Sequence, residues 1–237
     1  MPDGISITWY GHATWSLAGP DGTTVLLDPW LTGPTAPAGI LESLEADVIA
    51  LTHGHGDHTG DVLAVAARLQ VPVLAPVEVG GALEANGVEN VTGFGKGGTV
   101  EKGGIRFTMT EASHTGGIQV GGKEAGYCEP AGYVITFANG TRLYAAGDTS
   151  IFSDMALIRE LYAPSIAILP IGGHYTMDPF QAAHACRLLG VAHVLPGHFG
   201  TFPILTGTPA ELRSELAGLG LAEQVQVHEL EPGGTLP

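Results

Sequence analysis

Residues 53–58 read His-Gly-His-Gly-Asp-His and directly follow a short apolar run at residues 47–52. Imidazole and carboxylate groups are ligands for divalent metals such as zinc, and an open catalytic site needs several of them to converge. The glycines between them are small enough to let a metal ion approach. The alternative interpretation is an ordinary polar surface loop, and the rest of the chain has to decide between the two.

The composition is that of a globular protein. The chain has 237 residues, of which 44% are hydrophobic and 14% charged, and its mean hydropathy is +0.22; these values favour a folded domain over disorder. No apolar run is long enough to cross a bilayer. The first Lys or Arg is Arg68, so the N-terminus lacks the basic region of a signal peptide. We expect one domain over residues 1–237, located in the cytoplasm, and leave its oligomeric state open.

The charge balance argues against two classes of partner. Nine Lys and Arg against 24 Asp and Glu give a net charge of −15, and such a surface repels nucleic-acid phosphates and anionic membranes. We therefore expect a small-molecule substrate. Cys128 and Cys186 do not form a CxxC pair, and Cys186 sits in a helical pattern, which indicates a buried core thiol. Without a secretion signal we expect no disulfide.

Hydrophobic periodicity predicts an α/β chain. Apolar or β-branched runs predict strands at Ile5–Tyr10, Thr23–Asp28, Asp47–Thr52, Val71–Ala75, Ile105–Thr110, Gly132–Ala138, Arg142–Ala146, Ile166–Pro170, Ala192–Leu195 and Gln224–Leu230. Helical spacing predicts helices at Asp61–Leu69, Phe152–Tyr162, Pro179–Leu189 and Pro209–Leu219. Asn139-Gly140 predicts a two-residue hairpin turn. Mixed sheet followed by alternating helices and strands favours a sandwich with helices on its outer faces.

Further candidate ligands lie just beyond the predicted strand ends, where α/β sheets build their sites. They are His12, Asp28, His114, Asp148, His174 and His198. His114, Asp148 and His198 are interpreted as ligands. Asp28 is either a turn residue before Pro29 or a hydrogen-bond partner of a ligand histidine. His12 and His174 are either pocket residues or ordinary loop histidines.

Within the cluster, side chains two apart in an extended segment point the same way, so His53 and His55 can share one metal, while Asp57 and His58 turn toward a second position.

The remaining polar residues are given structural roles. His184, His193 and His228 fall within helix or strand patterns and are interpreted as structural. Asp61 is interpreted as a first-turn acid favoured by the helix dipole.

The order of these residues resembles a known family. His53-x-His55-x-Asp57-His58, followed by His114, Asp148 and His198, is similar to the five-motif pattern of the metallo-β-lactamase superfamily, with Asp28 as its first acid. Motifs along nearly the whole chain resemble more closely the UPF0173 metal-dependent hydrolases, relatives of the ascorbate-6-phosphate lactonase group. They lie at residues 10–12, 27–33, 51–58, 146–149, 152–155 and 169–177.

The resemblance implies a fold and a ligand set. The fold is a four-layer αββα sandwich of two mixed sheets flanked by helices, with the metals at one edge of the sheets. The resemblance assigns His53, His55 and His114 to a first divalent ion. It assigns Asp57, His58 and His198 to a second, with Asp148 bridging. Zinc is the expected metal, with manganese or iron as alternatives. A Glu in place of His55 would resemble the diiron oxidoreductase branch, so hydrolysis is favoured over redox chemistry.

The leading functional hypothesis is hydrolysis by a hydroxide held between two divalent metal ions. Asp57 would bind metal and orient the hydroxide, and His174, or failing that His12, would stabilise the oxyanion or protonate the leaving group. No Arg or Lys flanks the candidate site, although Lys123 could serve one anionic group. This favours a small ester, lactone or thioester. The alternatives are a phosphodiesterase of the same superfamily and a metal-binding or sensing protein without turnover.

Overall fold

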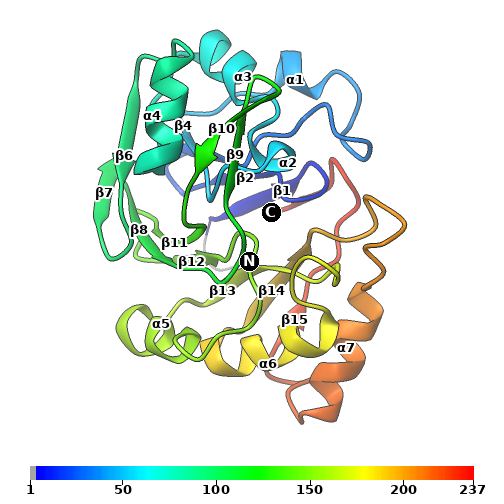
Figure 1. The fold of residues 1–237 in the computed structure, drawn as a ribbon. Coiled ribbons are helices and arrows are strands. Elements are labelled where there is room, and N and C mark those ends of the chain that lie inside the picture. Colours follow the sequence, from blue (N-terminus) through cyan, green and yellow to red (C-terminus); the bar gives the residue numbers. More distant parts are fainter. Residues whose placement is uncertain (1–3) are drawn as a thin grey trace.

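Two β-sheets lie face to face in the computed structural model, which describes residues 4–237 (Figure 1). In spatial order, the first sheet contains β16 (Thr235–Leu236), β1 (Ser6–Trp9), β2 (Trp15–Ala18), β3 (Thr24–Leu27), β4 (Val48–Ala50), β5 (Val73–Pro76) and β6 (Val91–Phe94). The second contains β15 (Gln226–Val227), β14 (His193–Gly197), β13 (Ile166–Pro170), β12 (Arg142–Ala145), β11 (Ala131–Thr136), β8 (Ile105–Glu111) and β7 (Thr99–Lys102). A separate hairpin pairs β9 (Gly117–Val120) with β10 (Lys123–Tyr127).

Helices cover the outer face of each sheet. They are α1 (Ile40–Ser43), α3 (Val62–Leu69), α4 (Val77–Ala85), α5 (Met155–Tyr162), α6 (Pro179–Leu189) and α7 (Pro209–Gly218). The short helix α2 (Gly56–Thr59) instead lies within the histidine-rich run after β4. Figure 1 shows α1, α3 and α4 on one side of the paired sheets and α5, α6 and α7 on the other. The four-layer αββα arrangement implied by the resemblance is therefore present.

Both sheets have the same pairing pattern. In each sheet the three pairings on one side are antiparallel and the three on the other side are parallel. Antiparallel neighbours can be joined by tight turns, whereas parallel neighbours need a crossover connection. Helices α3, α5 and α6 lie in such crossovers. The parallel strands of both sheets consequently end at one edge, where their following loops meet.

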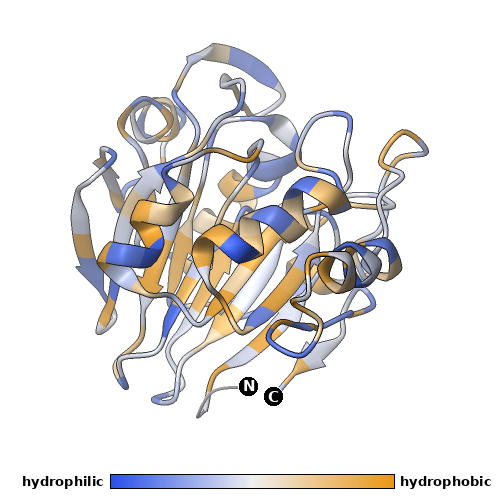
Figure 2. Cartoon of the chain, turned by 90° about the horizontal axis from the view of Figure 1, so that it is seen from below, coloured by the Kyte–Doolittle hydropathy of each residue, from blue (hydrophilic) through white to orange (hydrophobic). Residues whose placement is uncertain are grey.

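Three apolar layers hold the sandwich together. Between the sheets, Trp9 and Leu17 of the first sheet pack in one buried cluster with Phe107 and Tyr133 of the second. A second buried cluster joins the outer face of one sheet to α5, α6 and α7, and a third joins the other sheet to α3 and α4. Figure 2 shows α5–α7 from below, with hydrophilic residues on the helices and mostly hydrophobic strands behind them. Burial on both faces explains why the central strands read as continuous apolar runs.

The predicted long elements are present, and the shortest ones were missed. Helix α6 and strand β13 have the predicted bounds, and the other predicted elements are found within a few residues of theirs. Strands β2, β6, β7, β9, β10 and β16 and helices α1, α2 and α4 were not predicted. Most span four residues or fewer, and every residue of β10 is exposed. Such segments have too few buried positions to produce a hydrophobic period.

The hairpin predicted at Asn139-Gly140 is present, but its loop has three residues instead of two. The Phe137 N–H donates to the Thr141 carbonyl at 2.9 Å, which leaves residues 138–140 as a three-residue loop. Only Gly140 has a positive φ, at 85°. A two-residue type I′ turn needs positive φ at both central residues, whereas a three-residue loop needs it at one, commonly glycine. Asn139 instead accepts a hydrogen bond from the Thr141 N–H through its side-chain oxygen at 3.0 Å.

Two further expectations concern the whole chain. Both cysteines are free and buried, and Cys186 packs in the cluster beneath α6, as predicted. Within residues 4–237, no helix is both long and apolar enough to cross a bilayer.

Candidate metal centre

The candidate ligands gather at the edge where the strands of both sheets end. His12 lies in the β1–β2 turn and Asp28 directly follows β3, while residues 53–58 lie after β4. From the second sheet, His114 follows β8, Asp148 follows β12 and His198 follows β14. The sequence placed these residues at strand ends. The facing of the two sheets brings their side chains together.

The backbone at this edge is strained. Among the described residues, six non-glycine residues have positive φ, and His12, Asp28, His174 and His198 are four of them. Left-handed conformations are unfavourable for residues with a Cβ and persist only where the surrounding structure imposes them. These four residues therefore have their side chains aimed by their neighbours rather than by local preference.

Three imidazoles form a first group. One nitrogen from each of His53, His55 and His114 lies within 4.8 Å of the others. His53 Nε2 and His55 Nδ1 are 3.0 Å apart. His53 is fully buried, whereas His55 and His114 border solvent. The Ser113 N–H donates to Thr149 Oγ1 at 2.9 Å, which ties the loop bearing His114 to the loop bearing Asp148.

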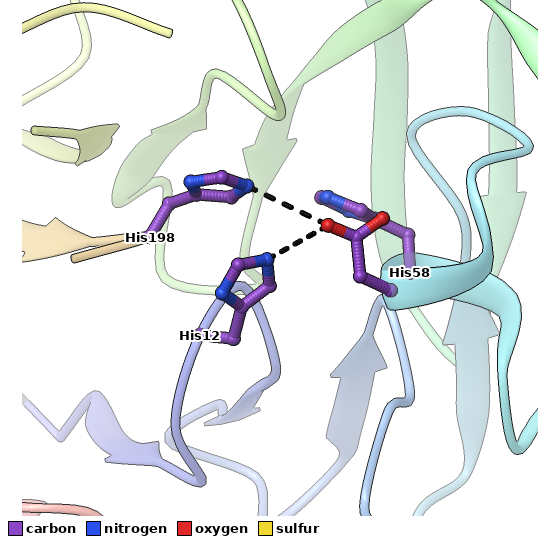
Figure 3. A group of neighbouring side chains, drawn as sticks. His12, His58 and His198 are labelled. Carbon is purple, nitrogen blue, oxygen red and sulfur yellow. Dashed lines mark hydrogen bonds and ion pairs between the residues drawn. The ribbon is translucent and has the colours of Figure 1, made fainter. Parts of the chain in front are cut away.

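A second group lies beside the first. His12, Asp57, His58 and His198 each offer one atom within 4.8 Å of the others. Asp57 Oδ2 lies 3.0 Å from His12 Nε2 and 3.8 Å from His198 Nε2. Figure 3 shows the rings of His12, His58 and His198 converging on the same point from three separate segments. His12 was left open between a pocket role and an ordinary loop role, and the structure places it in the pocket.

Asp148 lies between the two groups. Its Oδ1 is 3.4 Å from His58 Nε2, and its Oδ2 is 3.1 Å from His198 Nε2 and 3.5 Å from His114 Nε2. It also shares a third candidate ligand group with His53 and His58. One carboxylate thus faces histidines of both groups, which is the position that a bridging ligand needs.

Asp28 holds candidate ligand side chains in place and is not a candidate ligand itself. Its carboxylate accepts from the Thr52 N–H at 2.8 Å and from Thr52 Oγ1 at 2.7 Å, and it lies 2.9 Å from His58 Nδ1. Thr52 Oγ1 is also 3.0 Å from His53 Nδ1. Histidine ligands typically donate the N–H of their second ring nitrogen to such a partner, which fixes the ring and leaves the other nitrogen for the metal. Of the two interpretations left open for Asp28, the structure supports the hydrogen-bond partner.

The glycines of the cluster make room for β9, which the sequence did not indicate. A Cβ on Gly54 would lie 2.8 Å from the Ile118 Cα, and a Cβ on Gly56 would lie 2.5 Å from the Gln119 side-chain oxygen. The Gln119 N–H donates to the Gly54 carbonyl at 2.7 Å. The ligand run is therefore packed directly under the β9–β10 hairpin.

The electrostatics of the metal-free site suit metal binding. Burial lowers the pKa of His53, His55 and His114, so these imidazoles stay neutral and keep a free lone pair. Burial opposes ionisation of Asp148, but His198 and His58 outweigh it and hold its pKa well below the usual range. His58 is the exception: Asp148 and Asp28 outweigh burial and raise its pKa well above normal, so a metal ion has to displace its proton.

Unpaired nitrogens give a direct test of whether a metal fits. His58 Nε2 and both ring nitrogens of His198 are buried without a hydrogen-bond partner among the described residues. A buried polar atom without a partner is costly, and native proteins rarely leave one so. A cation bound there would take the lone pair of one ring nitrogen of each histidine. The donor set of imidazole and carboxylate groups therefore fits divalent metal.

One predicted site residue lies outside both groups. His174 is exposed, and its ring packs edge-on against Tyr175 at 4.4 Å between centroids; it belongs to none of the candidate ligand groups of residues 4–237. Asp61, expected at a helix start, is the N-cap residue of α3; its side chain caps no helix N–H, and its carboxylate accepts from the Thr32 N–H at 2.8 Å instead. Sequence reasoning missed Thr52 and Thr201, because a lone threonine carries no signal of what it touches.

Comparison with known proteins agrees with this site. Residues 23–199 match the β-lactamase superfamily domain model. A UPF0173 metal-dependent hydrolase of Koribacter versatilis is 46% identical over 98% of this chain and 97% of its own. The chain belongs to the UPF0173 family of the β-lactamase superfamily. A second UPF0173 metal-dependent hydrolase, from Rubrobacter xylanophilus, is 44% identical over 100% of this chain and 98% of its own.

A solved structure extends the likeness to three dimensions. Igni18, a metallo hydrolase from the hyperthermophilic archaeon Ignicoccus hospitalis, is 33% identical, with a TM-score of 0.86 over 98% of this chain and 97% of its own. The family and the fold implied by the sequence motifs are thus confirmed. As a UPF0173 protein, the chain is a metal-dependent hydrolase with a cluster of His and Asp side chains able to hold its metal.

Proposed function

We propose that this UPF0173 protein hydrolyses a small ester, lactone or thioester, using water activated by two divalent metal ions. The first ion binds His53, His55 and His114, and the second binds Asp57, His58 and His198, with Asp148 shared. The observation that carries the proposal is the pair of adjacent ligand groups with Asp148 facing both. Bound there, two divalent ions would supply a water of near-neutral pKa and would polarise the electrophile's oxygen.

Asp57 is suited to orient the attacking water. Burial opposes ionisation of Asp57, but the hydrogen bond from His12 and the charge of His58 outweigh it and lower the pKa of the carboxyl. Ionised, the carboxylate only accepts hydrogen bonds. Its side chain is 31% exposed, against 4% for Asp148. Asp57 therefore has one oxygen among the imidazoles and a face toward an incoming substrate.

His174 is proposed as the group that protonates the leaving group. It lies after β13 on the edge where the site is built, and its side chain is exposed. His12 is not suited to that step, because it is only 1% exposed and cannot touch a substrate.

The absence of nearby cations favours an uncharged electrophile. Within the described chain, no Arg or Lys pairs with Asp28, Asp57 or Asp148. Lys123 pairs with Val120 at the turn of the β9–β10 hairpin, and His55 lies at the other end, beside Gly117. Three residues of strand separate these ends by roughly 10 Å. Phosphodiester recognition normally uses Arg or Lys on the phosphate oxygens.

An aromatic rim beside the second group favours an apolar portion in the substrate. The rim consists of Trp30 and Phe202, whose ring centroids are 6.1 Å apart. Both rings also pack edge-on to His12. Phe202 is 39% exposed, so it retains surface that an apolar acyl or alcohol group can cover.

The metal scheme is tested by His55→Ala and His198→Ala, each with its metal content measured. We expect each variant to lose one ion and at least about 100-fold in hydrolysis, as for other metal-activated nucleophiles. His184→Ala, a change on α6 outside both groups, is the control. Full activity in metal-depleted protein would exclude the scheme.

The substrate class is tested by a panel run on zinc-, manganese- and iron-loaded protein. We expect aryl esters, lactones or thioesters to be turned over faster than bis(p-nitrophenyl) phosphate. Faster turnover of the phosphodiester would identify a phosphodiesterase instead. Tight metal binding that leaves no coordination position open to inorganic phosphate would indicate a sensing protein.

A further inference from the structure

The surroundings of His12 are those of a metal ligand. His58 has Nδ1 against the Asp28 carboxylate, and His53 has Nδ1 against the Thr52 hydroxyl. His12 repeats the arrangement, with Nδ1 2.8 Å from Thr201 Oγ1 and Nε2 facing the second group. An anchored outer nitrogen with the inner nitrogen turned to the ion is the usual environment of a histidine ligand.

The main chain of His12 is also fixed from several directions. Its carbonyl accepts from the Trp9 indole N–H at 3.0 Å and from the His198 N–H at 2.9 Å. The second contact joins His12 directly to a proposed ligand of the second ion. The backbone is held at a φ of 49°, a conformation that costs about 1–3 kcal/mol for a residue with a side chain. An ordinary turn residue in this position would be glycine or asparagine.

Burial restricts what the imidazole can reach. His12 is 1% exposed, and its ring centroid lies 3.9 Å from that of His198 and 6.0 Å from that of His58. Figure 3 shows the three rings around one central point. The nearest polar atom to Nε2 is Asp57 Oδ2 at 3.0 Å. The side chain therefore acts on the second ion or on Asp57, and not on the substrate.

We propose that His12 is a ligand of the second metal ion through Nε2, and that Thr201 is the hydroxyl partner that orients its ring. This inference rests on the proposed dinuclear site, and it adds to that site a ligand from the β1–β2 turn. Without an ion, Nε2 donates to Asp57. A bound ion would take the place of that proton, and Nδ1–H would then donate to Thr201 Oγ1, which already lies at hydrogen-bond distance.

The experiment compares His12→Asn and Thr201→Val with the unchanged protein. Asparagine tolerates the left-handed backbone of position 12, and valine replaces the Thr201 hydroxyl at nearly the same volume. Each metal-free protein is titrated with Co²⁺, and both bound ions are followed by isothermal calorimetry. Thr206→Val, an exposed threonine of the same loop, is the matched control.

We expect Thr201→Val to weaken binding of the second ion by about 10–100-fold, the usual effect of losing an outer partner. His12→Asn should weaken it further, and binding of the first ion should stay unchanged in both. In the Co²⁺-loaded protein, His12→Asn should show one fewer strongly shifted imidazole N–H signal by proton NMR. A histidine that only supports Asp57 would not contribute such a signal.

The inference would be overturned if His12→Asn binds the second ion within about threefold of the affinity of the unchanged protein and shows the same set of shifted N–H signals. If His12→Asn does not fold, Thr201→Val decides alone, and an unchanged second-ion affinity overturns it. Failure of the proposed function is distinguishable from both results, because the unchanged protein itself would then bind only one ion or none.

Discussion

At the scale of single residues, the site is built by contacts that hold side chains in unfavourable conformations. His12, Asp28 and His198 adopt left-handed backbone conformations, and each is held by hydrogen bonds from another segment. Gly54 and Gly56 show the same dependence on a neighbour, because β9 lies directly against them. The positions of the candidate metal ligands thus depend on how closely distant segments of the chain pack against one another.

The two glycines allow a matched test of that approach. A methyl group at Gly54 would meet the backbone of Ile118, whereas one at Gly56 would meet only the end of the flexible Gln119 side chain. We expect Gly54→Ala to lower the free energy of unfolding by about 1–3 kcal/mol, as overpacking does, and to weaken metal binding. Gly56→Ala should change both by much less. Urea denaturation and metal titration measure the two effects, and equal losses in the two variants would contradict this explanation.

At the scale of elements, strand β14 connects two different histidine environments. Its last residue precedes His198 in the metal site, and its first residue, His193, lies at the opposite end of the sheet. There His193 Nδ1 is 3.0 Å from His228 Nε2, just beyond β15. This second pair belongs to no candidate ligand group within residues 4–237, which agrees with the structural role expected for both.

The His193–His228 pair should make stability depend on pH. Burial and the neighbouring His193 lower the pKa of His228 from about 6.5 to about 4. Between these pH values the unfolded chain binds a proton that the folded chain excludes. The contribution of His228 to the free energy of unfolding is therefore fully present above pH 6.5 and is lost as the pH drops toward 4. We expect His228→Asn to reduce that fall. Urea midpoints at pH 7.5 and 4.5 test this, with His184→Asn as the control, and an unchanged pH dependence in His228→Asn would refute it.

The loop between β14 and α7 carries both Thr201 and the Phe202 ring of the aromatic rim. If the rim binds the apolar part of the substrate, Phe202→Ala should remove an aromatic contact worth about 1 kcal/mol, or about fivefold in KM. We expect kcat to change less than KM for an aryl ester. Ile204→Ala, exposed in the same loop, should leave KM unchanged. Equal effects of the two variants would argue against a rim that recognises substrate.

At the scale of the whole molecule, the candidate metal centre joins the two sheets. His53, His55, Asp57 and His58 come from the first sheet, and His114, Asp148 and His198 come from the second. Bound ions would therefore crosslink the two halves of the sandwich. We propose on this basis that the chain folds as one domain, since neither half contains a complete ligand group for both ions.

Removal of metal should consequently destabilise the whole chain. An ion present at about 100 times its Kd adds about 2.7 kcal/mol, and each kcal/mol moves the Tm of a domain of this size by about 2–4 °C. We expect chelation to lower Tm by about 5–10 °C per ion, with a single transition before and after. Calorimetry with and without chelator measures both. Two separate transitions would show that the halves unfold independently.

Local pattern was sufficient for much of this protein. The helices and buried strands, the run at residues 53–58 and the position of His114, Asp148 and His198 after strands are all properties of short segments, and motif order indicated the family. Strand β10 escaped prediction because it is exposed throughout and has no hydrophobic period. Strand β9 has alternating burial but spans only four residues, too few to form a recognisable pattern.

Only the tertiary structure decided which of these residues meet. Thr201 and His12 are 189 positions apart in the sequence and touch at 2.8 Å. Asp28 forms hydrogen bonds with Thr52 and His58, which lie on neighbouring segments. Position 54 has to be glycine because β9, some sixty residues later in the chain, packs directly against it. The sequence by itself determined the kinds of ligand and the edge of the sheet where they lie. Their number, orientation and outer partners depend on the facing of two sheets, a long-range packing that no local pattern encodes.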